Sequence, residues 1–311
     1  MAMVHHIQFL KYADIDFAKW DYCIHSANNG LVYALSGYLH CICPQWDALV
    51  MGDYEAVMPL PQKKKWGIAY LYQPWGLAQG GIFSRHLLTA EIEAAFYNAA
   101  TQHFRYGTFD GNETHCLRNT PKTKITWRNN FVLPLSRPYE TLYNQYDKDA
   151  QKNIRRANRY QQFVCNNVTV EEVAALYTAQ YGQLNSEANS AQMQRLIAAG
   201  KWLQYQGLGF VQAVRDTNTN SLLCAGLFGL YRSRIYYILG APTTDGRNHQ
   251  SVYLMLDSVI AAYATKASLF DFEGSDIPNV ASFYSKFGSI NKPYPCVHIN
   301  RLPWPINKLK S

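Results

Sequence analysis

Short runs of alternating apolar and polar residues open the chain, and this pattern predicts strands. Residues 46–60 (WDALVMGDYEAVMPL) alternate around Gly52 and Asp53, a pair that is typical of a hairpin turn. The aromatic-rich run 66–73 predicts a further strand, which ends at Pro74 before a glycine-rich loop. The first half therefore begins with a hairpin and a third strand.

A helical pattern follows this loop. Apolar residues recur at helical spacing over 86–102, which predicts a helix packed by one face. A strand is predicted next at 106–110, and a further β-rich segment over 124–135 completes the first unit.

The second half repeats the same order of elements. Residues 209–215 and 222–231 flank a tight turn and predict a second hairpin. The elements predicted after it are a strand at 234–239, a loop at 241–248, a helix at 250–264 and a strand at 269–273. Two short strings, Phe109-Asp110-Gly111-Asn112 and Phe272-Glu273-Gly274-Ser275, occupy corresponding places. The agreement predicts an internal duplication, the alternative being a single α/β chain with look-alike segments.

Helical segments separate the two copies. A helix is predicted over 139–160, after Pro138, and two more over 170–184 and 191–205. The first carries a basic run, namely Lys148, Lys152, Arg155, Arg156 and Arg159. We therefore expect an α/β protein with one domain over 1–138 and a second over 139–311.

Composition narrows the class of protein. Of the 311 residues, 48% are hydrophobic and 16% are charged, a balance that can bury two cores. The start of the chain does not resemble a signal peptide, and no apolar run is long enough to span a membrane, so we expect a soluble, cytoplasmic protein. Seven scattered cysteines without a C-x-x-C pair predict reduced thiols and no metal site. A net charge of +7 mildly favours phosphate-bearing ligands or RNA, and nothing indicates DNA.

Three strings carry a resemblance to a known family. The string 152–157 (KNIRRA), the string 270–275 (FDFEGS) and the pattern Phe283-Tyr284-Ser285-Lys286-Phe287-Gly288 resemble the Fem-type and related GNAT-like N-acyltransferases. The resemblance implies two GNAT-like domains in tandem, with a mixed α/β sheet in each and the site in the C-terminal copy. It also implies transfer of an acyl or aminoacyl group to a small-molecule or peptide amine by direct attack, without a tightly bound cofactor. The donor is acyl-coenzyme A in one branch and aminoacyl-tRNA in the other.

The donor loop of the coenzyme A branch corresponds to residues 245–251. Arg247 starts its motif, whereas His249, Gln250 and Ser251 stand at the places of the phosphate-binding glycines. Arg247 and Asn248 are candidates for contact with donor phosphates, the alternative being an exposed loop cap.

The resemblance also suggests catalytic residues. Tyr284 stands where the Fem pattern has a lysine that stabilises the tetrahedral intermediate, and Lys286 lies two residues further on. Glu273, at the end of a predicted strand, is placed to orient an amine or accept its proton. A purely structural place in a core or on a strand remains the alternative for Tyr284 and Glu273.

The basic helix offers an anion-binding site. Arg155 and Arg156 point about 100° apart on a helix, so Lys152 with one of the two arginines is the expected grip. A solvated helix face is the alternative. Beside the acyltransferase, two other functions stay open: a catalytically degenerate GNAT-fold ligand-binding protein and an RNA-associated protein.

Overall fold

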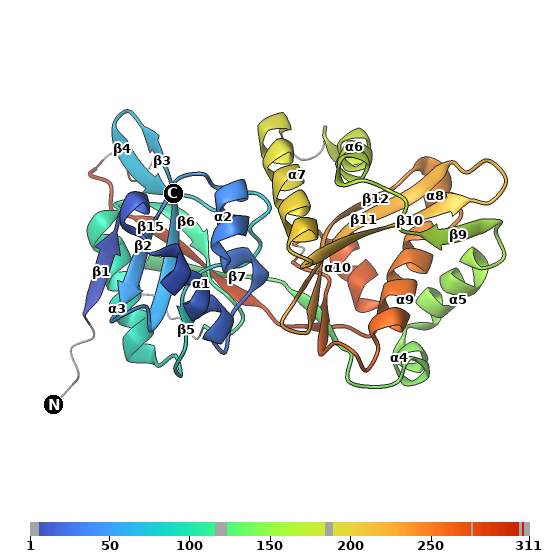
Figure 1. The fold of residues 1–311 in the computed structure, drawn as a ribbon, viewed down its shortest axis with the longest axis horizontal. Coiled ribbons are helices and arrows are strands. Elements are labelled where there is room, and N and C mark those ends of the chain that lie inside the picture. Colours follow the sequence, from blue (N-terminus) through green and yellow to red (C-terminus); the bar gives the residue numbers. More distant parts are fainter. Residues whose placement is uncertain (1–5, 116–122, 184–188, 275, 305–306, 308–311) are drawn as a thin grey trace. The chain divides into compact units, whose positions relative to one another are not determined.

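The computed structural model describes residues 6–115, 123–183, 189–274, 276–304 and 307. The chain divides into two compact units, Met1–Arg128 with Pro293–Ser311 and Asn129–Lys292. Each unit is built on one mixed β-sheet (Figure 1).

The first unit contains an eight-stranded sheet and three α-helices among its described residues. Its strands are β1 (Ile7–Leu10), β2 (Trp46–Met51), β3 (Ala56–Lys65), β4 (Ile68–Leu71), β5 (Phe83–Ser84), β6 (Tyr106–Asp110), β7 (Thr123–Arg128) and β15 (Tyr294–Asn300). Its helices are α1 (Phe17–Ser26), α2 (Ser36–Ile42) and α3 (Ala90–His103), with short 3-10 turns at Tyr12–Asp14 and Val32–Ala34. The sheet runs β1-β2-β3-β4-β6-β15-β7, with β5 paired to β3. Every residue of β2 is buried, so both faces of this strand are covered.

The second unit contains a seven-stranded sheet. Its strands are β8 (Phe131–Pro134), β9 (Gln162–Cys165), β10 (Gly209–Asp216), β11 (Leu222–Tyr231), β12 (Arg234–Pro242), β13 (Leu269–Asp271) and β14 (Ile290–Asn291). Its helices are α4 (Tyr139–Gln145), α5 (Lys148–Ala157), α6 (Val170–Tyr181), α7 (Ser190–Tyr205), α8 (Thr244–Asn248), α9 (Ser251–Tyr263) and α10 (Pro278–Ser285). The sheet runs β9-β10-β11-β12-β13-β8-β14.

The two sheets have the same plan and exchange one strand each. In the first unit β15, the last strand of the chain, lies between β6 and β7. In the second unit β8, which follows β7 in sequence, occupies the equivalent place between β13 and β14. The duplicated order of elements expected from the sequence is therefore present, with the last strand of each copy paired in the sheet of the other.

This exchange shifts the limits of the units from those drawn on the sequence. The expected domains, 1–138 and 139–311, assign each strand to the half of the chain in which it stands. The β-rich segment predicted over 124–135 contains two strands, β7 and β8, which belong to different sheets. Partner choice is a tertiary property that the alternation of residues does not encode.

Two further elements differ from the expectation. The helix expected over 139–160 is two helices, because Asp147 adopts a non-helical conformation and caps α5 by accepting a hydrogen bond from the Asp149 N–H. The segment 241–248, expected to be a loop, includes the short helix α8, which Thr243 caps.

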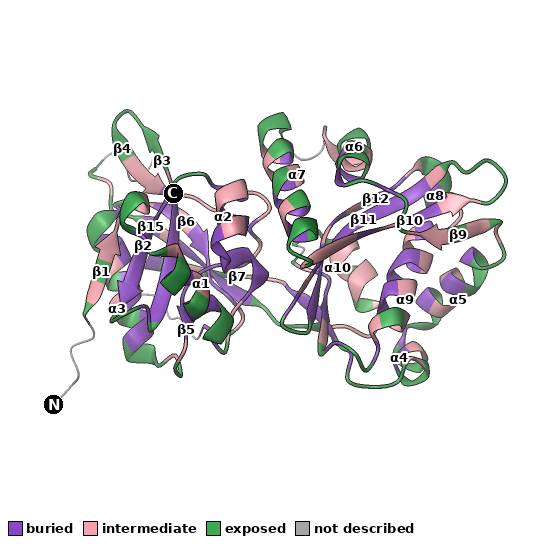
Figure 2. Cartoon of the chain, viewed as in Figure 1, coloured by how far each residue is buried: buried purple, intermediate pink, exposed green. Residues whose placement is uncertain are grey.

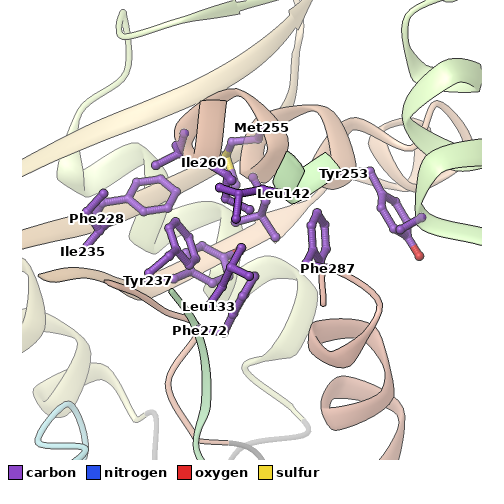
Figure 3. Close-up of a cluster of buried hydrophobic side chains, with 14 of the residues drawn as sticks. Leu133, Leu142, Phe228, Ile235, Tyr237, Tyr253, Met255, Ile260, Phe272 and Phe287 are labelled. Carbon is purple, nitrogen blue, oxygen red and sulfur yellow. The ribbon is translucent and has the colours of Figure 1, made fainter. Parts of the chain in front are cut away.

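Aromatic and aliphatic side chains fill the core of the second unit (Figure 3). The labelled residues come from strands β8, β11 and β12, helices α4 and α9, and the segments that follow β13 and α10. They are Leu133, Phe228, Ile235, Tyr237, Leu142, Tyr253, Met255, Ile260, Phe272 and Phe287. Burial of each such side chain contributes roughly 1.5–3 kcal/mol to folding. Figure 2 shows buried and exposed positions alternating along α5, as an amphipathic helix requires, whereas α9 is almost entirely buried or half-buried.

Candidate functional site

Strands β12 and β13 run parallel and then part. They pair only from Arg234–Leu269 to Tyr236–Asp271, after which β13 ends and β12 continues to Pro242 along β11. The edge of β12 that faces β13 is therefore left open from Tyr237 onward among the described strands. Openings at the carboxyl ends of parallel strands are the usual ligand sites of α/β sheets.

A glycine makes room at this opening. A register shift between Leu227 and Phe228 places a bulge where β11 pairs with β12. The hydroxyl of Tyr237 lies 2.1 Å from where a Cβ atom on Gly240 would stand. Since no side chain fits there, only glycine at 240 allows the Tyr237 phenol to lie along the strand.

Four tyrosines gather around the opening. Tyr177 and Tyr181, one turn apart on α6, have ring centroids 5.2 Å from each other. Tyr237 of β12 and Tyr284 of α10 have centroids 6.4 Å apart, with their rings nearly perpendicular. Burial raises the pKa of Tyr237 and Tyr284 above the usual range, and the nearby phenols of Tyr177 and Tyr181 contribute to both shifts. All four belong to the second unit.

Glu273 lies beside this cluster in a fixed backbone conformation. Its φ of 64° is in the left-handed region, which is uncommon for a residue other than glycine. Its N–H donates to Asp271 Oδ1 at 2.9 Å, and its carbonyl accepts from the Phe131 N–H at 3.3 Å. Asp271 is itself fixed, because its Oδ2 accepts from Arg234 Nε at 3.0 Å and Nη2 at 2.6 Å. A buried ion pair thus holds the turn that presents Glu273.

The alignment of Asp110 with Glu273 suggested by the sequence does not match the strand ends. Asp110 is the last residue of β6, and the last residue of β13 is Asp271. Both aspartates are buried and each pairs with an arginine, Arg128 in the first unit and Arg234 in the second. Asp271 is therefore the structural counterpart of Asp110, and Glu273 has no such counterpart.

Tyr284 and Glu273 are close enough to interact electrostatically. After burial, the negative charge of Glu273 is the largest contribution that raises the pKa of Tyr284. The phenol stacks on Phe272, with centroids 5.2 Å apart. Tyr284 therefore stays protonated at neutral pH and is available as a hydrogen-bond donor next to a carboxylate.

Lys286 is engaged elsewhere in the second unit. Its Nζ lies 2.6 Å from Asp149 Oδ2 at the start of α5, and this hydrogen bond raises the pKa of Lys286. Its carbonyl accepts from the Asp147 N–H at 2.8 Å. Of the three residues predicted to be catalytic, Glu273 and Tyr284 lie together and Lys286 joins α10 to α5.

The residues of the predicted donor loop lie on α8 and just after it. The Arg247 guanidinium sits 5.6 Å from the centre of the Tyr181 ring, so it reaches the tyrosine cluster by a cation–π contact. Asn248, the last residue of α8, is exposed.

The start of α9 is buried: Ser251 is fully buried, although no side chain hydrogen-bonds to the first N–H groups of the helix. Ser251 Oγ donates to Gln162 Oε1 at 2.7 Å, and Gln162 Nε2 donates to the His249 carbonyl at 3.1 Å. The His249 ring stacks on Tyr160 with centroids 4.3 Å apart. A phosphate cradle formed by backbone N–H groups would require the start of α9 to become accessible.

The basic residues of α5 form an exposed surface. Lys152, Arg155 and Arg156 are all exposed, and Arg156 donates to the Tyr160 hydroxyl at 3.0 Å. Through Tyr160 and His249 this surface connects with the loop that follows Arg247. The basic residues of α5 therefore lie near the loop that follows α8, the helix that carries the other donor-side candidates. Glu273 and Tyr284 lie at the β12–β13 opening.

Sequence reasoning missed Tyr177, Tyr181, Tyr237 and Asp271. The spacing of Tyr177 and Tyr181 places both on one face of a helix and was a usable signal. Tyr237 and Asp271 carry no such signal in the sequence, because a buried tyrosine or aspartate on a strand gains its role from its tertiary neighbours.

The described residues contain neither a metal-ligand cluster nor a membrane-spanning helix. No cluster of three or more potential metal ligands occurs in the part of the chain that the structure describes. Within the same residues, no helix has both the length and the apolar character needed to cross a membrane.

Comparison with known proteins identifies the fold. No family model matches the sequence, and no curated protein matches it either. Among solved structures the chain is similar to FemX, with a TM-score of 0.65 and 12% identity over 97% of this chain and 99% of that one. It is also similar to a conserved protein of unknown function from Bacteroides thetaiotaomicron (TM-score 0.60, 8% identity, 95% and 100% covered). A tandem GNAT protein from the clavulanic acid biosynthesis pathway gives a TM-score of 0.53 at 9% identity, with 96% and 99% covered. The predicted fold, a mixed α/β protein with two tandem GNAT-like domains, is confirmed.

Proposed function

We propose that this chain is an N-acyltransferase whose site is the β12–β13 opening of the second unit. The observation that carries the proposal is the placement of Glu273 and Tyr284 at this opening, where Tyr284 stacks on Phe272, the residue that precedes Glu273. Acyl transfer to an amine needs a proton acceptor for the nucleophile and a proton donor for the leaving group. Glu273 and Tyr284 supply this pair.

The proposed mechanism is direct attack. Glu273 accepts a proton from the acceptor ammonium, and the freed amine attacks the acyl carbonyl to give a tetrahedral intermediate. The intermediate collapses as Tyr284 donates its hydroxyl proton to the departing sulfur or ribose oxygen, and the proton on Glu273 returns the phenolate to phenol through solvent. The attacking nitrogen releases its second proton to solvent as the neutral amide forms. Because Tyr284 stays protonated at neutral pH, it is in the correct state to donate to the leaving group.

The donor is proposed to carry phosphates, as both acyl-coenzyme A and aminoacyl-tRNA do. Arg247, at the rim of the tyrosine cluster, and Asn248 are the proposed contacts nearest the reacting end. Lys152, with Arg155 or Arg156, supplies further exposed cations on α5. These exposed cations suit the phosphates of either donor.

The acylation itself is the direct test. The full chain is incubated with acyl-coenzyme A species or charged tRNA and a set of primary amines, and acylated amine is detected by mass spectrometry. We expect Tyr284→Phe and Glu273→Gln each to lower the rate roughly 100-fold, the usual contribution of a general acid or base. Tyr97→Phe is the matched control, since it removes a buried phenol from the first unit. Equal losses in all three variants, or none in the first two, would refute the assignment.

Donor binding is tested separately by thermal shift. Ligands that bind the native state raise its melting temperature, so acyl-coenzyme A and a non-hydrolysable aminoacyl-tRNA analogue are compared on wild type and Arg156→Ala. A shift with the tRNA analogue that Arg156→Ala diminishes supports the α5 surface as its site.

A degenerate ligand-binding protein is the second candidate function. It is favoured by one observation: Ser251 is fully buried at the start of α9, where an acyl-coenzyme A enzyme needs accessible backbone N–H groups. A ligand that stabilises the protein without any acylated product would support this alternative.

A further inference from the structure

An exposed, positively charged hairpin projects from the sheet of the first unit. Strands β3 and β4 pair from Gln62–Leu71 to Lys65–Ile68, and the turn between them is Trp66-Gly67. Both turn residues have positive φ, 51° and 77°, which is the geometry of a tight two-residue hairpin. The six residues 63–68 (KKKWGI) are all exposed, as the green tip of this hairpin in Figure 2 shows.

The composition of this tip is unusual for a solvated turn. Trp66 is 90% exposed and Ile68 is 55% exposed, although both have large apolar side chains. Asparagine or glycine would satisfy a positive φ at position 66 with less strain, so the turn itself does not require tryptophan. The apolar residues stand at the apex of the hairpin, and the lysines stand directly behind them on β3.

The three lysines are free of acidic partners. Lys63, Lys64 and Lys65 form no ion pair in the part of the chain that the structure describes. Lys63 lies 4.1 Å from the centre of the Tyr72 ring and Lys65 lies 5.0 Å from the centre of the Trp66 ring. Their charges are therefore available to an external anionic surface.

We propose that this hairpin tip is a docking site for an anionic lipid bilayer. Tryptophan favours the bilayer interface, where its ring is buried and its N–H stays hydrated, and flanking lysines bind the negative headgroups. The order of residues along the tip, with the aromatic at the apex and the lysines behind it, matches this layered environment. A single-stranded nucleic acid would instead call for aromatic faces spaced along a groove, and the tip has one exposed aromatic ring.

The attachment is weak and reversible. Each lysine near an anionic membrane contributes roughly a fivefold factor in binding, so three give roughly a hundredfold preference for anionic over neutral lipid. Salt screens this term, and a single tryptophan adds a small salt-independent part. The hairpin therefore recruits the protein to a charged surface without anchoring it.

The test measures binding of the full chain to vesicles by flotation. Phosphatidylcholine vesicles with and without phosphatidylglycerol are compared for wild type, for a variant with Lys63→Gln, Lys64→Gln and Lys65→Gln, and for Trp66→Ala. The matched control replaces three exposed lysines elsewhere, Lys124→Gln, Lys266→Gln and Lys292→Gln, and removes the same net charge. All of these side chains are exposed, so unchanged melting temperatures are expected.

The proposal expects binding to anionic vesicles only, weakened roughly 100-fold by the hairpin substitutions and little by the control set. Trp66→Ala should remove the blue shift in tryptophan emission that vesicles induce. The proposal is overturned if wild type does not bind anionic vesicles, or if the two triple variants lose binding equally. It is also overturned if the hairpin substitutions abolish binding to an RNA homopolymer while vesicle binding persists.

Discussion

The two units share a strand order but differ at the carboxyl ends of two corresponding strands, β4 in the first unit and β12 in the second. In the first unit the chain after β4 turns back and fills this place: Gln73 Oε1 accepts from the Asp110 N–H at 2.9 Å, and the Gly80 N–H donates to the Gly111 carbonyl at 3.1 Å. Asn112 Nδ2 closes the arrangement by donating to the Gly80 carbonyl at 3.0 Å.

In the second unit no such loop returns among the described residues, because β12 leads directly into α8. Tyrosine side chains and Glu273 border the same place instead. Two copies of one fold can therefore differ in their capacity for a reaction. A site can form only in the copy whose own loop does not fill the space at the end of the strand. This contrast is the reason for placing the proposed reaction in the second unit.

The largest effect is expected from removing the exchanged strand of the first unit. A chain ending at Lys292 lacks β15, so β6 and β7 lose their shared partner and the first unit should lose its whole stability, about 5–15 kcal/mol for a domain. The second unit should keep its fold. Hydrogen exchange on α3 and α9 distinguishes the units, and a chain ending at Leu302, which keeps β15, is the control. If the amides of α3 stayed protected from hydrogen exchange in the chain ending at Lys292, the role of β15 in the first unit would be contradicted.

The next effect compares the two buried aspartates. Asp271→Asn leaves Arg234, only 10% exposed in its side chain, without its counter-charge, and should destabilise the second unit by about 3–5 kcal/mol. Asp110→Asn should cost about 1 kcal/mol, since the Arg128 side chain is 42% exposed and water solvates it. Denaturant unfolding of both variants gives the two values, and equal losses would show that the pairs are equivalent.

Acid should affect the two units in opposite directions. Burial lowers the pKa of His115, in the first unit, from 6.5 to about 4, so the unfolded chain takes up a proton first as the pH falls from 6.5. The first unit should lose up to about 3 kcal/mol between these values. Burial raises the pKa of Asp257, in the second unit, from 3.8 to about 6, so the folded state takes up the proton first and the second unit should gain up to about 3 kcal/mol as the pH falls from 6 to 3.8.

Hydrogen exchange at about pH 7 and about pH 4.5 measures both trends, because it reports each unit's opening free energy. The matched variants are His115→Gln and Asp257→Asn, each of which should flatten the pH dependence of its own unit alone. Groups that titrate elsewhere are common to wild type and variant and cancel in the difference. A trend of the same sign in both units, insensitive to the variants, would contradict the assignment.

The smallest expected effect concerns two phenols. Tyr97→Phe removes the hydroxyl that lies 2.9 Å from His115 Nδ1 and should destabilise the first unit by about 1 kcal/mol. Tyr284→Phe should change stability by less, because its ring contacts with Phe272 remain. Thermal unfolding measures both, and a larger loss for Tyr284→Phe would indicate a structural hydroxyl rather than a functional one.

Much of the fold followed from the sequence because local pattern determines local structure. Alternation gave both hairpins, and helical spacing gave α3 and α9 within a few residues. The destination of β8 and β15 did not follow, since either strand fits any half-buried place in a sheet. The site divides in the same way. The resemblance led to Tyr284 and the end of a predicted strand led to Glu273, whereas Asp271 and Arg234, which support Glu273, are paired only by the register of two strands.

The strand exchange has a consequence for synthesis on the ribosome. The second unit is one uninterrupted segment and is complete once Lys292 has emerged, whereas the first unit still lacks β15 at that moment. Domains usually mature in the order of their translation. Here we expect the reverse, with the later-made half reaching its native state first and the earlier-made half remaining an open sheet in need of protection until the final strand arrives.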